Sequence, residues 1–470
     1  MTTTTRPTSS PQKIRRTIAG GKRAEGWDLQ RKSQRIHRPD PRRIPLRTPD
    51  PSLSSVAGLV PFGQYLRKLG LDRELRDCFG HLKKGRGVVY PMSDQLHLII
   101  DANAVGEGRV FGIENLAADP LFTHLAGGAV PSIDTLYRDL DRFGPLELLT
   151  LESIMANHGL FDARLASCDV VHLDIDSTVE PLFGSQEGAL PGHNPRYHGR
   201  PSYHPVLSAC AETRTCVGAV LKPGDTALGS EDRETIAAHV RRMKKKLRPD
   251  QVMRVRIDAA GDCVEIMAAV EDEGAFITTK ARLSQDLCQA IYRSRHWQTI
   301  EDDVDGRPLR QVAEVAFSRK CWKDAGRVYR VIAVRTREEV SGKQVYLWDD
   351  LDYTVKAFIT SDWESDAETL ARDYENRAEI ELMIREWKHD LGIGAVPTDS
   401  FDANHAMLLL KLLTHNLVRD YVVTCMPLLA RWRLAWLRRV LMRVPGRILR
   451  TGNQRYLRLP VRSPLYRILA

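Results

Sequence analysis

The chain has 470 residues, 43% hydrophobic content, eight cysteines and a net charge of +9, so two to four domains and a polyanionic partner such as nucleic acid or a membrane surface are expected. It has no apolar run of 18 residues, no signal-type apolar start and no CxxC pair, which disfavours a membrane span, a secreted protein, a zinc ribbon and a disulfide framework. A reducing, cytoplasmic setting is therefore predicted.

The N-terminal part of the sequence changes character near residue 56. Residues 1–55 are rich in Arg, Lys, Pro, Thr and Ser and poor in large apolar residues, which predicts a basic disordered tail. From 56 to 165 the apolar residues follow helical spacing, with Ser93 as a predicted helix cap and Pro131-Ser132 as the predicted opening of another helix. We interpret this second segment as a helical DNA-binding domain of helix-turn-helix type, with an ordinary helical bundle as the alternative.

Strands and helices alternate between residues 166 and 298. The predicted elements are, in order, strands at 170–175, 206–213 and 216–221, a helix at 231–246, a strand at 252–257, a helix at 262–272 and a strand at 275–280. A polar, Gly-rich loop at 184–200 separates the first strand from the second. This alternation predicts an α/β fold with a mixed sheet and flanking helices.

A β-rich segment precedes a long helix in the next part of the chain. Residues 299–360 contain two predicted strands, at 328–334 and 353–359. One long helix is then predicted from Ser365 to Leu391, and a second helix from 404 to 423. The two helices are expected to pack side by side.

The C-terminal end of the chain is strongly basic. No acidic residue follows Asp420, whereas arginines recur to the end, and arginine is well suited to phosphate contacts. The sequence therefore divides into a basic tail (1–55), a helical DNA-binding domain (56–165), the first part of a catalytic core (166–298), a β-rich insertion (299–360), the second part of the core (361–425) and a basic C-terminal region (426–470).

Four chemically useful residues lie on one stripe of the predicted long helix. Tyr374, Arg377, Glu381 and Lys388 follow the spacing Y-x2-R-x3-E-x6-K, which places their side chains within roughly 60° of one another on a regular helix. A carboxylate flanked by a phenol, a guanidinium and an ammonium suits a metal-bound DNA phosphate. The plain alternative is an ion pair between Arg377 and Glu381, four residues apart.

Two aspartates follow predicted strands and are candidate partners of Glu381. Asp176 and Asp258 would converge with Glu381 if their strands are neighbours and the helix covers the sheet. Carboxylates that hold two Mg²⁺ ions are the usual means of breaking a phosphodiester bond. Asp174 remains an alternative to Asp176, and Asp262 an alternative to Asp258, although Asp262 lies where a helix cap is expected.

These residues resemble a known family, the DDE transposases of bacterial insertion sequences, in the branch that carries the Y-R-E-K signature. The resemblance covers residues 56–460, and it is strongest in HLDIDSTVEPLFGSQEGALPGHNPRYHGRPSYHP and YENRAEIELMIREWKHDLG. It implies a ribonuclease-H-like fold with a β-rich insertion between the second Asp and the Glu. One departure concerns Ala259-Ala260-Gly261 after Asp258, where relatives often have Ser-Gly-Phe.

The resemblance also implies roles for individual residues. The residues expected to bind Mg²⁺, with Mn²⁺ as a substitute, are Asp176, Asp258 and Glu381. The residues expected to contact DNA phosphates are Tyr374, Arg377 and Lys388. An aromatic side chain of the insertion is expected to stack on a flipped base, and Trp322 and Trp348 are the candidates, with core packing as the alternative use of each.

The expected function is cut-and-paste transposition. Such an enzyme binds double-stranded DNA at terminal inverted repeats, hydrolyses the strand at each end and joins the freed 3′ hydroxyl to target DNA. A homodimer in the active DNA complex and a location in the bacterial cytoplasm, at the nucleoid, are implied as well. The alternatives are a nuclease of the same fold that lacks strand transfer, and a domesticated DNA-binding protein without catalysis.

Overall fold

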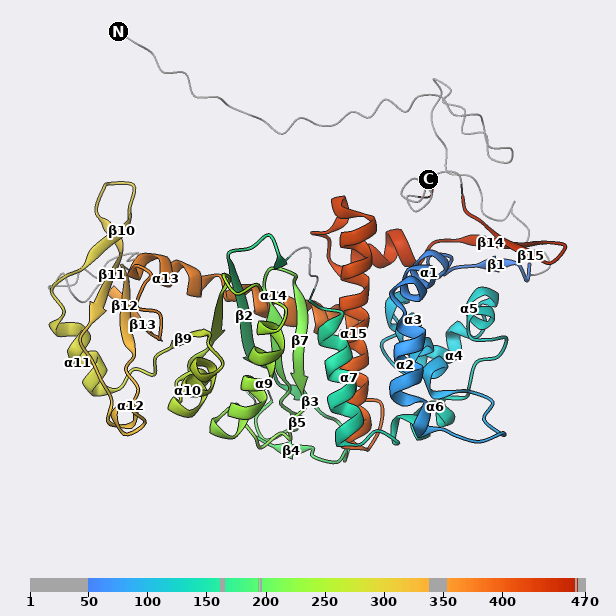
Figure 1. The fold of residues 1–470 in the computed structure, drawn as a ribbon, viewed down its shortest axis with the longest axis horizontal. Helices are drawn as coiled ribbons and strands as arrows, with labels where there is room; N and C mark the ends of the chain where they lie inside the picture. Colours follow the sequence, from blue (N-terminus) through green and yellow to red (C-terminus); the bar gives the residue numbers. More distant parts are fainter. Residues whose placement is uncertain are drawn as a thin grey trace, which may run out of the picture. The chain divides into compact units, whose positions relative to one another are not determined.

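The computed structural model describes residues 50–160, 165–192, 194, 197–337, 353–460 and 463 (Figure 1). The chain divides into two compact units, Met1–Pro51 and Ser52–Ala470, and every element described below belongs to the second unit. The predicted basic tail falls mainly on residues 1–49, outside the described ones. Among the described helices, none combines the length and the apolar character that a membrane crossing requires.

The first part of the second unit is helical. Its helices are α1 (Leu59–Leu69), α2 (Leu71–Phe79), α3 (Met92–Val105), α4 (Gly112–Leu116), α5 (Pro120–Leu125), α6 (Ile133–Leu140) and α7 (Pro145–Asn157). Gly70 joins α1 to α2 in the left-handed conformation, with φ at 82°, which a glycine adopts without strain. The helix predicted to open at Pro131-Ser132 is confirmed as α6, with Ser132 as its N-cap. The helix α3 begins at Met92 after Pro91, so the predicted cap at Ser93 is wrong.

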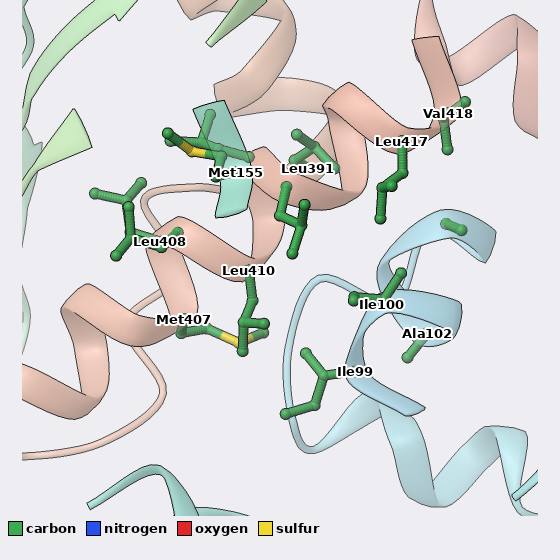
Figure 2. Close-up of a cluster of buried hydrophobic side chains, with 14 of the residues drawn as sticks. Ile99, Ile100, Ala102, Met155, Leu391, Met407, Leu408, Leu410, Leu417 and Val418 are labelled. Atoms are coloured by element: carbon green, nitrogen blue, oxygen red, sulfur yellow. The ribbon is translucent and has the colours of Figure 1, made fainter. Parts of the chain in front are cut away.

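A helix from the C-terminal part of the chain lies in the core of this helical region. The helix α15 (Phe401–Cys425) packs against α3 and α7, and Figure 2 shows their apolar side chains in one cluster. Asn416 of α15 ties the elements together, because its amide donates to the carbonyls of Met155 in α7 (2.8 Å) and Cys216 in the sheet (2.7 Å). The predicted helix at 404–423 is confirmed, and it shares its core with residues 59–157.

A large mixed sheet forms the rest of the fold. In spatial order its strands are β10 (Gln298–Asp302), β11 (Pro308–Val315), β12 (Arg330–Arg337), β13 (Tyr353–Thr360), β9 (Phe276–Lys280), β8 (Val252–Ile257), β2 (Val170–Ser177), β6 (Val206–Cys210) and β7 (Thr215–Val220). The strand β8 is parallel to both β2 and β9, and the other neighbouring pairs are antiparallel. The predicted mixed α/β architecture is thereby confirmed.

The alternation of side chains in β2 gives the sheet two different faces. Leu173 and Ile175 point into an apolar core with α9 (Arg233–Lys244) and α10 (Val264–Asp272). Asp174 and Asp176 point to the opposite face, where α13 (Ala367–Glu375) and α14 (Ala378–Glu386) lie. The acidic side chains of β2 therefore lie on the side of the sheet opposite the apolar core.

The β-rich segment continues this sheet instead of forming a separate one. The strands β10–β13 join it through antiparallel pairing of β13 with β9, which places Phe358 opposite Lys280. The predicted strands at 328–334 and 353–359 correspond to β12 and β13. The helices α11 (Gln285–Arg293) and α12 (Lys320–Asp324) lie in the connections between the strands.

The predicted single helix from 365 to 391 is wrong in its continuity. The structure has α13, then α14, then a π-helical turn at Trp387–Leu391. Between α13 and α14 the backbone tightens, because the N–H groups of Arg377, Glu379 and Ile380 each donate to the carbonyl three residues earlier. The four signature residues therefore do not share one regular stripe, and Tyr374 belongs to a different helix from Glu381.

Two small sheets complete the described fold. The first contains β1 (Leu53–Ser54), β14 (Gly446–Thr451) and β15 (Gln454–Arg458), next to the short helix α16 (Leu434–Leu437). The second contains β3 (Glu180–Pro181), β5 (Pro201–Tyr203) and β4 (Leu190–Pro191), in the order β3-β5-β4. This second sheet organises the loop that follows Asp176.

Candidate active site

The two aspartates lie side by side at one edge of the sheet. Because β2 and β8 are parallel and Ile175 pairs with Ile257, the next residues along each strand, Asp176 and Asp258, are neighbours. Asp176 is the penultimate residue of β2, and Asp258 follows β8 directly. The Asp258 side chain also accepts a hydrogen bond from the N–H of Ala260 (2.9 Å), which fixes the turn at Ala259–Gly261.

Glu381 reaches the same edge from α14. The Arg377 guanidinium lies between the two acids, with Nη2 at 3.2 Å from Asp176 Oδ1 and Nη1 at 3.6 Å from Glu381 Oε1. All three acids line one open cleft of about 410 Å³. The Glu381 side chain is 60% exposed and that of Asp176 is 15% exposed, so one acid is free to move and the other is held.

The acids influence one another electrostatically. Burial raises the pKa of Asp176 to about 6, and the negative charges of Asp258 and Glu381 add to the rise, whereas Arg377 opposes it. A carboxyl in this position is stabilised in its ionised form by any further positive charge.

Asp174 and Asp262, the two alternative acids, are already engaged elsewhere. The Asp174 side chain is fully buried, and both its oxygens accept from Arg256, at 2.6 and 2.8 Å. Asp262 pairs with Arg319 and accepts from the backbone N–H of Arg282 at 2.6 Å. It does not cap α10, because the residue before that helix is Cys263, so the cap expected at Asp262 is wrong.

Tyr374 supports the site through the backbone. Its hydroxyl donates to the carbonyl of Ile257 (2.9 Å), the residue just before Asp258, and its ring packs against Phe358 at 4.5 Å between centroids. Burial raises the pKa of the Tyr374 hydroxyl to about 12, so it stays protonated at neutral pH. Its position anchors α13 to the end of β8.

Lys388 lies beside the cleft, in an adjoining cavity. Its ammonium donates to the Val179 carbonyl (2.9 Å) and pairs with Glu180 (3.0 Å). This cavity, of about 500 Å³, is also lined by Glu381 and Tyr197. Glu381 therefore borders both spaces, whereas Lys388 does not line the cleft of the two aspartates.

Two lysines that the sequence did not single out line the cleft with the acids. Lys280 ends β9 and Lys356 lies in β13, and both side chains are exposed. Lys280 is brought there because β9 runs parallel to β8, so the two strands end at the same edge. The sequence could have indicated Lys280, because this lysine stands at the end of a predicted strand. It could not indicate Lys356, because the position of that residue depends on pairing between distant strands.

The two candidate stacking residues have different outcomes. The Trp322 side chain is 1% exposed and packs edge-to-face with Phe317 and Tyr329, which agrees with the alternative of core packing. Trp348 lies outside the described residues. The buried Trp322 side chain is therefore not accessible to a DNA base.

The donor set of the cleft fits a hard divalent cation, but the side chains are not gathered around one point. Among the described residues, no three His, Cys, Asp or Glu side chains are close enough to hold a metal ion. Arg377 occupies the space between Asp176 and Glu381, and its Nε has no hydrogen-bond partner among the described residues. Metal binding by all three acids therefore requires the exposed Glu381 side chain to turn toward the aspartates.

Residues 39–470 match the family model described as "Transposase DDE domain group 1". Among solved structures, the fold is similar to the piggyBac transposase in its synaptic complex with hairpin DNA, with a TM-score of 0.41 and 11% sequence identity over 81% of this chain and 78% of that chain. A comparison with curated proteins finds no match.

Proposed function

Because the chain belongs to the transposase DDE domain group 1 family, we propose that it cuts DNA at the ends of a mobile element and joins the freed 3′ hydroxyls to target DNA. The observation that carries this proposal is that Asp176, Asp258 and Glu381, far apart in sequence, line one cleft. Basic side chains border the same cleft, which suits a polyanionic substrate. The mobile element in this proposal is a bacterial insertion sequence of the Y-R-E-K branch.

The three acids are the proposed metal ligands. Carboxylate oxygens are the ligands that Mg²⁺ prefers, and Mn²⁺ accepts the same set. When bound, the ions supply activation of the attacking oxygen and stabilisation of the leaving oxygen. The raised pKa of Asp176 supports this role, because burial and, to a smaller extent, the charges of Asp258 and Glu381 disfavour an ionised carboxyl that a bound cation would stabilise.

The basic residues of the cleft are proposed to hold the DNA backbone. Lys280 and Lys356 are exposed at the rim, so both have donors to offer a phosphate. Arg377, whose guanidinium pairs with Asp176 and Glu381, adds positive charge beside them. Lys388 is 30% exposed and borders Glu381 from the adjoining cavity, which suits a phosphate further along the strand. Tyr374 acts as a positioning residue for Asp258 in this proposal, through its hydrogen bond to the preceding carbonyl.

The finer parts of the proposal concern the fold and the assembly. A ribonuclease-H-like core is supported by the section β7-β6-β2-β8-β9, in which an antiparallel meander is followed by two parallel strands. The strands β10–β13 then represent the insertion between the second Asp and the Glu. A homodimer that holds two double-stranded ends in the bacterial cytoplasm and a helix-turn-helix-like role for residues 56–165 complete the proposal.

The test uses the DNA that flanks the chain's own coding sequence. Purified protein is incubated with labelled flanking DNA and a target plasmid, with Mg²⁺ or with a chelator. We expect metal-dependent cuts at inverted repeats and strands joined to the plasmid. Cuts without joined strands would indicate a nuclease instead, and binding without any metal-dependent cut would overturn an enzymatic function.

A further inference from the structure

An exposed aromatic cluster lies next to the candidate active site. The Phe183 side chain is 80% exposed and that of Tyr197 is 48% exposed. The Arg200 guanidinium carbon lies 4.4 Å from the centroid of the Phe183 ring and 5.6 Å from that of Tyr197. We refer to Phe183, Tyr197 and Arg200 as the aromatic platform.

The small sheet of β3, β5 and β4 builds the platform. The antiparallel pairing of β3 with β5 continues one residue further, because Leu182 N–H donates to the Pro201 carbonyl (2.9 Å). Phe183 and Arg200 therefore leave opposite strands at the same end of the sheet. A turn brings in Tyr197, whose carbonyl accepts from Arg200 N–H at 3.1 Å. Tyr197 and Arg200 thus belong to the polar loop at 184–200, and Phe183 directly precedes it.

The platform is fixed to the element that carries Glu381. Lys388, in the π-helical turn that follows α14, binds the Val179 carbonyl and Glu180 at the start of the small sheet. Tyr197 lines the cavity of about 500 Å³ that also contains Glu381 and Lys388. Phe183 lines the next cavity, of about 590 Å³, which again contains Lys388. These shared residues join the two cavities to the cleft of the acids.

The cavity that Tyr197 lines carries Arg385, Lys388 and His389 together with the acids Glu180 and Glu381, and Glu180 is paired with Lys388. No acidic side chain among the described residues pairs with Arg200, and Arg385 and His389 are exposed at the wall of the cavity that Tyr197 lines. Aromatic faces next to cationic side chains are the usual means of holding unpaired nucleotides, because every base has a stacking face and every nucleotide has a phosphate. An aromatic side chain placed for core packing would be buried, as Trp322 is.

We propose that the aromatic platform binds an unpaired nucleotide of the DNA held at the cleft, with the base stacked on Phe183 and the phosphate near Arg200. This inference rests on the proposed function, since it takes DNA to be the substrate of the cleft. It assigns the stacking role to the loop after Asp176, in place of Trp322.

The test compares two duplexes taken from the DNA flanking the coding sequence. One is blunt, and the other ends in a short single-stranded overhang that contains 2-aminopurine, whose fluorescence reports stacking. Binding is measured for two proteins: the Glu381→Gln variant, which serves as the parent, and the same variant with Phe183→Ala added. We expect Phe183→Ala to weaken overhang binding about tenfold, to change blunt binding less than twofold, and to abolish the fluorescence change. Phe183→Trp is expected to restore overhang binding.

A matched control is Tyr292→Ala, because the Tyr292 side chain is also 80% exposed but lies on α11. It is expected to leave overhang binding unchanged. The proposal is overturned if Phe183→Ala binds the overhang duplex as the parent does, or weakens both duplexes equally. Failure of the proposed function is seen separately, as the absence of metal-dependent cutting by the unsubstituted protein, since the binding measurement needs no cutting.

Discussion

Asp174 and Asp176 lie two residues apart on the same face of β2, yet their surroundings give them different roles. Asp174 is fully buried and bound by Arg256, which also pairs with Asp373 of α13. Asp176 opens onto the cleft and shares Arg377 with Glu381. One aspartate therefore connects β2 to β8 and α13, and the other remains available for chemistry.

The raised pKa of Asp176 predicts that replacing this acid stabilises the protein. The pKa is 3.8 in an ordinary carboxyl and about 6 here, so ionisation costs the folded state more than the unfolded state. The contribution of Asp176 to wild-type stability should fall as pH rises from about 4 to 6 and stay low above that. In metal-free buffer, Asp176→Asn should be more stable than wild type by about 1–3 kcal/mol at pH 8, with no difference near pH 3.5.

Thermal melts at several pH values, with a chelator present, measure this difference. A gap between the two proteins that does not change with pH would contradict the account of Asp176. The same variant should have lost its metal-dependent cutting of DNA.

The neighbouring substitution should have the opposite effect on stability. Asp174→Asn leaves the buried Arg256 guanidinium with Asp373 as its remaining carboxylate partner, and removing one member of a buried ion pair costs about 3 kcal/mol or more. Denaturant unfolding should show the loss, with the isosteric Asp176→Asn as control. Equal stabilities of the two variants would contradict the division of roles between these aspartates.

At the scale of elements, the connection between α13 and β8 is important for the site. Tyr374→Phe keeps the ring on Phe358 and removes only the hydrogen bond to the Ile257 carbonyl. We expect a stability loss of about 1 kcal/mol and cutting slowed several-fold, because the end of β8 is held less firmly. Thermal melts and cleavage rates of the variant check this expectation. If Tyr374→Phe abolished cutting as completely as Glu381→Gln does, the hydroxyl would instead take part directly in the reaction.

Periodic patterns in the sequence predicted the elements well where local spacing decides the structure. The strand β8 has the predicted bounds, 252–257, and α10 and α15 were placed within a few residues. The helix break near Arg377 was missed, because backbone bonds that shift from four residues to three leave the apolar spacing almost unchanged. Apolar spacing alone therefore does not separate one long helix from two.

The candidate site was predictable only in part. Asp176, Asp258 and Glu381 follow from strand ends and from a helix stripe, and the structure brings them to one cleft. Lys356 was not predictable, since the antiparallel pairing of β13 with β9 decides its position. The platform residues were not predictable from the sequence either, because the exposure of Phe183 depends on how the small sheet folds.

For the whole molecule, the excess of positive charge predicts binding that weakens with salt. Each phosphate contact adds about 0.9 to the slope of log affinity against log salt concentration for duplex DNA. If Lys280 and Lys356 of the cleft contact phosphates, replacing both with Gln should make the slope shallower by about 2. Lys320→Gln, at an exposed site on α12, is the matched control. Slopes that are the same for all three proteins would exclude backbone contact by the cleft lysines.

The central claim is that three distant acids share divalent cations, and localised cleavage of the polypeptide tests it most directly. Fe²⁺ takes the place of Mg²⁺, and added peroxide and ascorbate produce radicals that cut the chain near the bound ion. We predict cuts close to residues 176, 258 and 381. Excess Mg²⁺ and Glu381→Gln should both suppress these cuts. The control Glu379→Gln should not, because Glu379 is an exposed residue elsewhere on the same helix. Cuts at only one of the three positions, or a pattern unaffected by Glu381→Gln, would contradict it.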